Sequence, residues 1–243
     1  MRLAMKNDEA RQKLIRAAGQ VFAEVGYDAA TVRQITDRAE ANVASINYHF
    51  GDKLHLYREV LSETFSQRTH LLGLLCSDGS PKERLHHFIE WMVAEEKDEA
   101  RPWHRILVMR EISDSSSSRC PELLVELIRP NHRILSSILN DLTRHSLTKT
   151  ELEILTQMVA ALCVHWLDRS AFIQKLSPEL TFSSEQTKSL VEQIHQFALG
   201  GVTSFVRQAR LSRTYRIGTG ERRSRMPGTI DRKTVSVSRK ILR

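Results

Sequence analysis

The amino-acid sequence predicts an all-α fold for this chain of 243 residues, on three observations. Apolar residues recur every three or four positions, as on one face of a helix, and runs that alternate apolar with polar residues are rare. Only 10 glycines and 6 prolines interrupt the chain. Helix starts recur as capping boxes, in which a Ser or Thr and a Glu or Gln three residues later satisfy each other's free backbone N–H groups. These boxes are Thr31/Gln34, Ser80/Glu83, Thr148/Glu151 and Ser183/Gln186.

The first helix is predicted from about Asp8 to Val25, and Gly26 is placed to end it in a left-handed conformation. Two short helices follow within Thr31 to Phe50. Turn-rich sequence at 76–81 and 113–121 separates the later helices. Pro130 removes one N–H from a helix expected after Pro121 and should kink it. The two longest amphipathic helices are expected last, at about Glu151–Lys175 and Ser184–Gln208.

The composition indicates a globular protein, because 41% of the residues are hydrophobic. No run of about 18 apolar residues occurs, and the N-terminus lacks the apolar centre of a signal peptide. We therefore expect a cytoplasmic protein and no membrane partner. Cys76, Cys120 and Cys163 are widely spaced and form no CxxC pair, so they are expected to be small buried hydrophobes. No metal site and no cofactor are predicted.

The positive charge is concentrated at the C-terminus. Residues 207–243 hold 12 Lys and Arg against Glu221 and Asp231, which leaves 24 basic and 27 acidic residues, a net charge of −3, for residues 1–206. The pI of about 9.5 is therefore weak evidence for nucleic-acid binding. Residues 209–243 lose helical periodicity and are predicted to be a disordered basic tail. This tail could add salt-sensitive affinity for DNA or be a solvated end.

The segment from Thr31 to Phe50 has the pattern of a helix-turn-helix. Thr31 caps a short helix, and Asn42 can cap the next one after a tight turn. In the second helix, at about 100° per residue, Val43, Ile46 and Phe50 face inward and Asn47 lies on the inner flank. The outer face presents short side chains and two rings, which suits the major groove of DNA. These outer residues are Ala44, Ser45, Tyr48 and His49.

Lys53 follows this second helix and is predicted to bind a DNA phosphate. Gly51 ends the helix, Asp52 can cap the next one, and Lys53 lies in its first turn, where its charge opposes the helix dipole. A phosphate would resolve that conflict. Thr31 and Arg33 are expected to contact the backbone on the other side of the groove. The predicted DNA-binding residues are Thr31, Arg33, Ala44, Ser45, Asn47, Tyr48, His49 and Lys53.

The last two helices have the pattern of elements that bind a partner helix. Their apolar residues fall on one face, and small residues near Gly201 would let another helix approach closely. The alternative is that this face is part of the core of a single chain. The predicted interface residues are Leu155, Val159, Leu162, Trp166, Leu190, Ile194, Phe197, Gly201 and Phe205.

The stretch from Gln12 to Leu61 resembles the TetR family of bacterial transcriptional regulators. The residues that carry the resemblance are Phe22, Gly26, Tyr27, Thr31, Val32, Ile35, Ala39, Tyr48, His49, Phe50, Lys53 and Leu56. Glu40 stands where the family usually has glycine, and Asn47 where a tyrosine is common. The sequences NVASINYHFGDK, RPNH and HQFALGG look most like the CecR-type branch of the family.

The resemblance implies a bacterial protein that is associated with the nucleoid through its function. It implies a homodimer whose last two helices form a four-helix bundle with those of the partner. It also implies a central domain that binds a small effector, and repression at a pseudo-palindromic operator that ends when the effector binds. The domains would be residues 1–57 for DNA binding, 58–208 for effector binding and dimerisation, and the tail 209–243. Activation instead of repression would use the same DNA contacts.

An effector site is predicted from aromatic and polar residues in the central region. The candidates are Trp91, Trp103, Met109, Arg110, His165 and Trp166. Ordinary core packing is the alternative for the apolar ones, and intramolecular ion pairs for the polar ones. The effector itself is not indicated by the sequence.

Two other classes of function compete with DNA binding. An enzyme is disfavoured, because the chain has no P-loop, HExxH or GxSxG motif, and His86 and His87 are adjacent rather than four residues apart. We therefore predict that the protein is not an enzyme. A helical ligand-binding or scaffold protein that has lost DNA binding remains open, because of Glu40 and Asn47.

Overall fold

The computed structural model describes residues 2–93, 103–113, 119–166, 175–181 and 183–223. These residues form helices, with no strand among them, which confirms the predicted all-α fold. The helices are α1 (Arg2–Ala29), α2 (Val32–Arg38), α3 (Ala44–Phe50), α4 (Lys53–Leu75), α5 (Pro81–Val93), α6 (Trp103–Ser113), α7 (Pro121–Leu142), α8 (Lys149–His165) and α10 (Ser184–Arg223). No helix in these ranges is long and apolar enough to cross a membrane.

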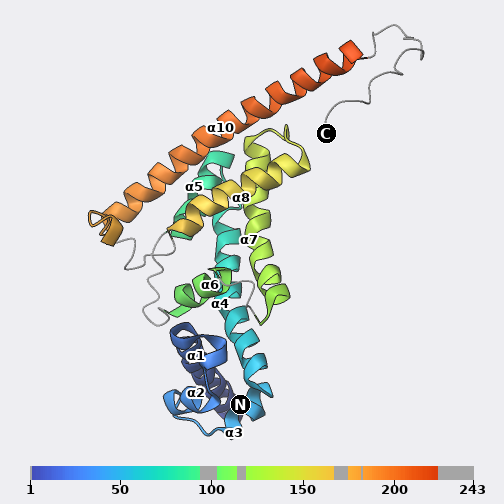
Figure 1. Ribbon diagram of the computed structural model, residues 1–243. Coiled ribbons are helices and arrows are strands. Elements are labelled where there is room, and N and C mark those ends of the chain that lie inside the picture. The colour runs from blue at the N-terminus through green and yellow to red at the C-terminus, as the bar shows by residue number, and fades with distance from the viewer. Residues whose placement is uncertain (1, 94–102, 114–118, 167–174, 182, 224–243) are drawn as a thin grey trace, which may run out of the picture.

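Two hydrophobic cores lie at the two ends of an elongated molecule. In Figure 1, α1, α2 and α3 lie together at one end, α4 leads away from them, and α10 lies across the far end. The first core joins α1–α4 with Trp103 and Leu107 of α6. The second joins α5, α7, α8 and α10 with Leu72 and Cys76 at the end of α4. Helix α4 contributes to both cores and so links them, and α7 does the same, because its Leu127 packs on the first core and its Leu135 lies in the second.

The predicted capping boxes are present in full at three of the four helix starts. The Thr31 and Thr148 side chains each accept a hydrogen bond from the backbone N–H three residues later, at Gln34 and Glu151. The Gln34 and Glu151 side chains in turn accept from the backbone N–H of the capping threonine. Ser80 and Glu83 make the same two bonds, at 3.3 and 2.7 Å. At α10 only half of the box forms. Ser183 accepts from Gln186 N at 3.2 Å, but the Gln186 side chain turns to Thr181 and Glu179.

The first helix is longer than expected but is interrupted where the sequence indicates. It begins at Arg2 rather than Asp8 and continues to Ala29 across a kink at Gly26, whose φ of 80° is left-handed. Only glycine adopts this φ without steric cost. The α7 helix runs without a break through Pro130. All three cysteines are free and buried, as predicted, and burial raises the pKa of Cys163 to about 12.

The prediction that helix ends near Gln208 is wrong for residues 209–223, because α10 continues to Arg223. Extending an existing helix needs no new nucleation, so even a polar sequence can follow it. Two contacts favour the extension: Ala209 is buried, and Arg213 donates to Ser146 O at 2.8 Å and to the Glu151 carboxylate. Residues 224–243 of the predicted tail lie outside the described residues.

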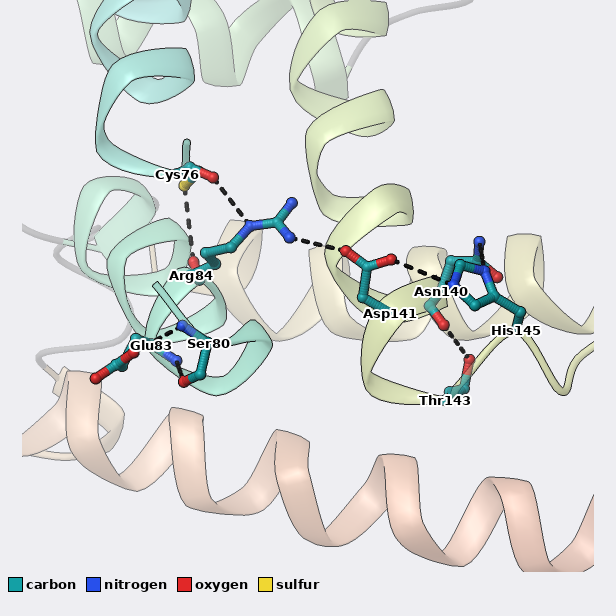
Figure 2. Close-up of polar contacts among 8 residues, drawn as sticks. All are labelled: Cys76, Ser80, Glu83, Arg84, Asn140, Asp141, Thr143 and His145. Carbon is teal, nitrogen blue, oxygen red and sulfur yellow. Dashed lines mark hydrogen bonds and ion pairs between the residues drawn. The ribbon is translucent and has the colours of Figure 1, made fainter. Parts of the chain in front are cut away.

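Arg84 ties the end of α4 to α7. Figure 2 shows its guanidinium between the Cys76 carbonyl, which it meets at 3.0 Å through Nε, and the Asp141 carboxylate, 2.8 Å from Nη1. The Arg84 side chain is only 19% exposed, so this ion pair is less screened by solvent than a surface pair. The C-terminal end of α4 is thereby fixed to the second core.

The α6 helix packs on α1 with its aromatic side chain against a glycine. A Cβ on Gly19 would lie 2.3 Å from ring atoms of Trp103, so the indole occupies the space of a side chain. On the same helix, Glu111 is buried and accepts a hydrogen bond from Tyr57 of α4. Burial and the Glu111 carboxylate raise the pKa of Tyr57, which stays a neutral donor. Helix α6 therefore contacts both α1 and α4.

Replacing Glu40 by glycine is expected to stabilise the protein by about 0.5–1 kcal/mol, because Glu40 holds a left-handed φ of 52° in the turn between α2 and α3. Denaturant unfolding of the variant measures this gain. The matched control is Ala39→Gly, one residue earlier, where φ is −81° and glycine should instead destabilise. Equal effects of the two changes would contradict a strained turn.

Candidate nucleic-acid interface

Helices α2 and α3 form a helix-turn-helix, as the sequence predicts. The turn is closed by backbone bonds from Ala39 N to Ile35 O and from Ala41 N to Thr36 O. The Asn42 side chain accepts from Ala44 N at 2.8 Å and so satisfies the first free N–H of α3. Glu40 adopts the left-handed conformation that glycine adopts more easily, so the turn forms despite the departure at this position.

The inner face of this unit fixes the position of α3. Ile35 and Ile46 are fully buried and Phe50 is 8% exposed, all in the first core. Gly51, with a φ of 84°, ends α3, and Asp52 caps α4 by accepting from His55 N at 2.8 Å. That bond and the His55 side chain lower the pKa of Asp52, which stays ionised. A short helix is thus fixed at both ends by its neighbours.

The outer face of α3 is made of exposed side chains. Tyr48 is 76% exposed and its ring meets that of His49, which is half-buried. Ala44 and Asn47 are exposed and Ser45 is half-buried. The placement of Asn47 on an inner flank is therefore wrong.

Val43 is 51% exposed, so the expectation that it faces inward is wrong. Its exposed methyl groups extend the outer surface of α3, and it was not among the predicted DNA-binding residues. Its backbone is helical, with a φ of −51° and a ψ of −38°, and the Asn42 side chain caps the helix from the preceding residue.

Lys53 binds backbone carbonyls of α1 and the following loop. Its Nζ donates to Tyr27 O at 2.9 Å and to Ala30 O at 2.8 Å, and lies 4.3 Å from the centre of the Tyr27 ring. The conflict between its charge and the α4 dipole is therefore relieved inside the protein, and a phosphate is not needed for this purpose.

Thr31 and Arg33 flank this surface at the start of α2. The Thr31 hydroxyl is engaged in its capping box. Arg33 is 87% exposed and its contact with Asp37 is long, at 3.8 Å. Arg38 nearby is bound to both carboxylate oxygens of Glu24, at 2.7 and 2.9 Å, and this bond lowers the pKa of Glu24. Arg33 is therefore the basic side chain of α2 that can break its ion pair, with Asp37, at a low cost in free energy.

The structure does not bring the six predicted effector residues together. Trp103 is buried in the first core, and Arg110 on the same helix is exposed, with Nη2 3.5 Å from Glu24 O. Trp91 and Trp166 pack instead on the second core. The remaining two are Met109, half-buried on α6, and His165, exposed beside Trp166.

The predicted dimer residues fall into two sets. Leu155, Val159 and Ile194 are buried in the chain's own second core, so the alternative of an intramolecular core holds for them. Phe197 is 69% exposed and Gly201 is exposed. The others are half-buried: Leu162, Trp166, Leu190 and Phe205. Two further residues of α8, Ile154 and Met158, are 46% and 55% exposed and were not among those predicted.

Comparison with known proteins matches both halves of the chain. Residues 14–60 match the family described as bacterial regulatory proteins, tetR family. Residues 81–202 match the C-terminal domain of the HTH-type transcriptional dual regulator CecR. The chain is 25% identical to the HTH-type transcriptional regulator SrpR of Pseudomonas putida, over 84% of this chain and 89% of SrpR. It is 42% identical to CecR of Shigella flexneri over 23% of this chain and 24% of CecR.

Solved structures show the same fold. The transcriptional regulator FadR of Bacillus subtilis, in complex with stearoyl-CoA, aligns with a TM-score of 0.63 at 17% identity, over 78% of this chain and 98% of FadR. FadR of Bacillus halodurans aligns with a TM-score of 0.59 at 19% identity over the same shares. The matched family and relatives are transcription regulators, not enzymes, as predicted. The chain belongs to the TetR family, with a CecR-type C-terminal domain, and is a transcriptional regulator with an N-terminal DNA-binding domain.

Proposed function

We propose that the protein is a cytoplasmic repressor that binds a pseudo-palindromic operator as a homodimer and is released by a small-molecule effector. The observation that carries the proposal is the outer face of α3, where Tyr48 is 76% exposed on a helix fixed by the buried Ile46 and Phe50. Residues 1–57 would bind DNA, and residues 58–208 would bind the effector and the second copy.

On this proposal α3 enters the major groove. Tyr48 and Asn47 offer polar groups to base edges or phosphates, and the methyl groups of Val43 and Ala44 suit the methyl group of thymine. Ser45 and His49 lie at the sides of this face. Contacts to the backbone come from Thr31 and Arg33 on α2.

Lys53 has fewer N–H donors free for a DNA phosphate than the sequence suggests. An ammonium has three N–H donors, of which two are used by the carbonyls of Tyr27 and Ala30, so one is left for a phosphate. Removing Lys53 would also leave those carbonyls unpaired. A loss of DNA binding by Lys53→Ala therefore needs a measurement of stability beside it.

Dimerisation is proposed through the exposed face of α8 and α10. Ile154, Met158 and Phe197 are large apolar side chains that a soluble monomer would expose to water. A Cβ added at Gly201 would have no atom within 4 Å, so a partner helix can approach this position closely. Two copies of these two helices would form a four-helix bundle.

The effector is proposed to bind in the central domain, where Trp91 and Trp166 remain candidates. Trp103 and Arg110 are better placed to transmit a change than to hold a ligand, because α6 contacts both α1 and α4. FadR of Bacillus subtilis binds stearoyl-CoA in its solved complex. We infer only that this fold accommodates organic effectors.

Tyr48→Ala tests the proposed DNA surface. We expect its affinity for a duplex from the gene's own upstream region to fall at least about tenfold, as for loss of one good base or backbone contact. The free energy of unfolding should change by less than about 0.5 kcal/mol, because the side chain is exposed. Fluorescence anisotropy and denaturant unfolding measure the two quantities.

The control is Leu71→Ala on α4, which removes a side chain that is 52% exposed and distant in sequence from α3. It should bind the duplex as the unaltered protein does. If Tyr48→Ala binds as tightly as this control, α3 is not the reading helix. If the unaltered protein binds no upstream duplex, the alternative of a scaffold that has lost DNA binding gains support.

A further inference from the structure

A hollow of about 430 Å³ lies between the C-terminal end of α7 and the middle of α10. Its floor is apolar and is formed by Leu142 of α7 with Val202 and Val206 of α10, while Leu211, which is 63% exposed, lies at its edge. Small-molecule sites have volumes of about 300–1,000 Å³. The hollow is therefore of the size that an organic ligand needs.

Three arginines rim this hollow, and no acidic residue lines it. Arg144 follows the end of α7, and Arg207 and Arg210 lie one turn apart on α10. Within the described part of the chain, the guanidinium groups of Arg144 and Arg207 have no hydrogen-bond or ion-pair partner, although the Arg144 backbone N–H donates to Asp141 O. Positive charge thus gathers above an apolar floor, on a body whose first 206 residues carry a net charge of −3.

The turn after α7 holds Arg144 at the rim. Arg144 and His145 both have left-handed backbone conformations, with φ of 52° and 54°, and Asn140 contacts the His145 ring at 2.7 Å. As Figure 2 shows, Asp141 points to Arg84 and His145, at 2.8 and 3.7 Å. The acid nearest to Arg144 in the sequence is therefore engaged elsewhere, and it does not compensate the charge of Arg144.

Arg213 fixes the distance between the two walls. Its guanidinium reaches from α10 to Ser146 O, at 2.8 Å, and to the Glu151 carboxylate at the start of α8. The pKa of Glu151 is lowered by its bonds to Thr148 and then by Arg213, so the clasp is an ion pair at neutral pH.

Arg210 lies on the opposite side of α10 from Gly201 of the proposed dimer face, whereas Leu211 lies on the same side as Phe197 but about four turns further along the helix. Gly201 and Arg210 are nine residues apart, which at about 100° per residue places them half a turn from each other. A ligand at Arg210 would therefore leave the Gly201 face accessible to a partner. The two sites can be occupied together.

We propose that this hollow binds a small amphipathic anion, whose carboxylate or phosphate group is held by the arginines and whose apolar body lies on the floor. Guanidinium groups bind both kinds of anion through paired, charge-assisted hydrogen bonds. The apolar side chains favour a ligand that also removes Val206, which is half-buried, and Leu211, which is 63% exposed, from water. The lining of this site includes neither Trp91 nor Trp166, the effector candidates named above.

Calorimetric titration of the full chain with decanoate, decyl phosphate and decanol tests the site. We expect at least one of the anions to bind, and decanol, which has the same tail without charge, to bind at least tenfold more weakly. The double variant Arg144→Gln, Arg207→Gln should weaken the anion at least tenfold. Comparing the two anions identifies the preferred head group. Methyl NMR shifts at Val202 and Val206 place the ligand.

The control is the double variant Arg129→Gln, Arg133→Gln, which removes the same charge from exposed positions of α7. It should bind the anion as the unaltered protein does. The proposal is overturned if this control loses as much affinity, if decanol binds as tightly as the anions, or if neither anion shifts the two valines. Failure here leaves operator binding, measured separately, unaffected.

Discussion

Replacing Gly19 by alanine is expected to lower the free energy of unfolding by about 2–4 kcal/mol, because the new methyl group would overlap the Trp103 ring. The new Cβ would lie 2.3 Å from ring atoms of Trp103, and the rigid indole has no flexible end that could rotate away. Trp103 must then leave a site where it is only 4% exposed. Alanine is otherwise the better helix former, so the loss would occur against the usual trend. Denaturant unfolding gives the size of the effect.

Gly73→Ala is the matched control for this change. Gly73 lies in α4, where an added Cβ would have no atom within 4 Å, so the same substitution should stabilise the protein by about 0.5–1 kcal/mol. The two variants are expected to differ in sign. Adding Trp103→Leu to Gly19→Ala should recover part of the loss, since the pair acts through one contact. A Gly19→Ala protein as stable as Gly73→Ala would show that α6 does not pack on α1 in this way.

The backbone signals are the part of the fold that the sequence predicts well. Gly26 and Gly51 both have the left-handed φ expected at their helix ends, and Thr31 and Thr148 form complete capping boxes. Such signals are local, because a few neighbouring residues determine them. The length of α10 is not local in this sense. It depends in part on the Arg213 contact with Glu151, 62 residues away in the chain.

The sequence predicts the candidate site where the pattern of a single helix determines which side chains are exposed. It does not predict contacts that depend on packing between distant segments. Tyr48 faces outward because Ile46 and Phe50 must face the core, and the spacing alone shows this. The partners of Lys53 could not be predicted, because they are carbonyls of a distant turn. The effector candidates separate for the same reason. Periodicity places Trp103 on the apolar side of its helix but does not say which core that side meets.

The dimer prediction shows the limit of what a helical wheel can predict. A wide apolar stripe on α10 covers two surfaces at once, so Ile194 faces the chain's own core while Phe197, three residues later, is exposed. The sequence shows that the stripe exists. It does not show where one surface ends and the other begins.

Phe197→Glu is expected to produce a monomer of 27.9 kDa and to reduce operator affinity about 10²-fold or more. A carboxylate in the middle of the α8 and α10 face would be buried without a partner in the dimer, which is costly. In the monomer the same residue is 69% exposed, so folding should be little affected. Light scattering and duplex titration measure assembly and binding. The loss of affinity follows because a single domain no longer gains from a second half-site on the same molecule.

The control is Val125→Glu on α7, which makes the same apolar-to-acid change at a side chain that is 53% exposed and lies outside α8 and α10. It should assemble and bind DNA like the unaltered protein. A Phe197→Glu protein that stays dimeric would move the interface away from this face. A monomer that binds the operator with full affinity would mean instead that one α3 is sufficient for binding. The affinity gained from a second half-site comes from the linkage of two DNA-binding domains in one dimer, so a monomer should lose it even if its own contacts with DNA are unchanged.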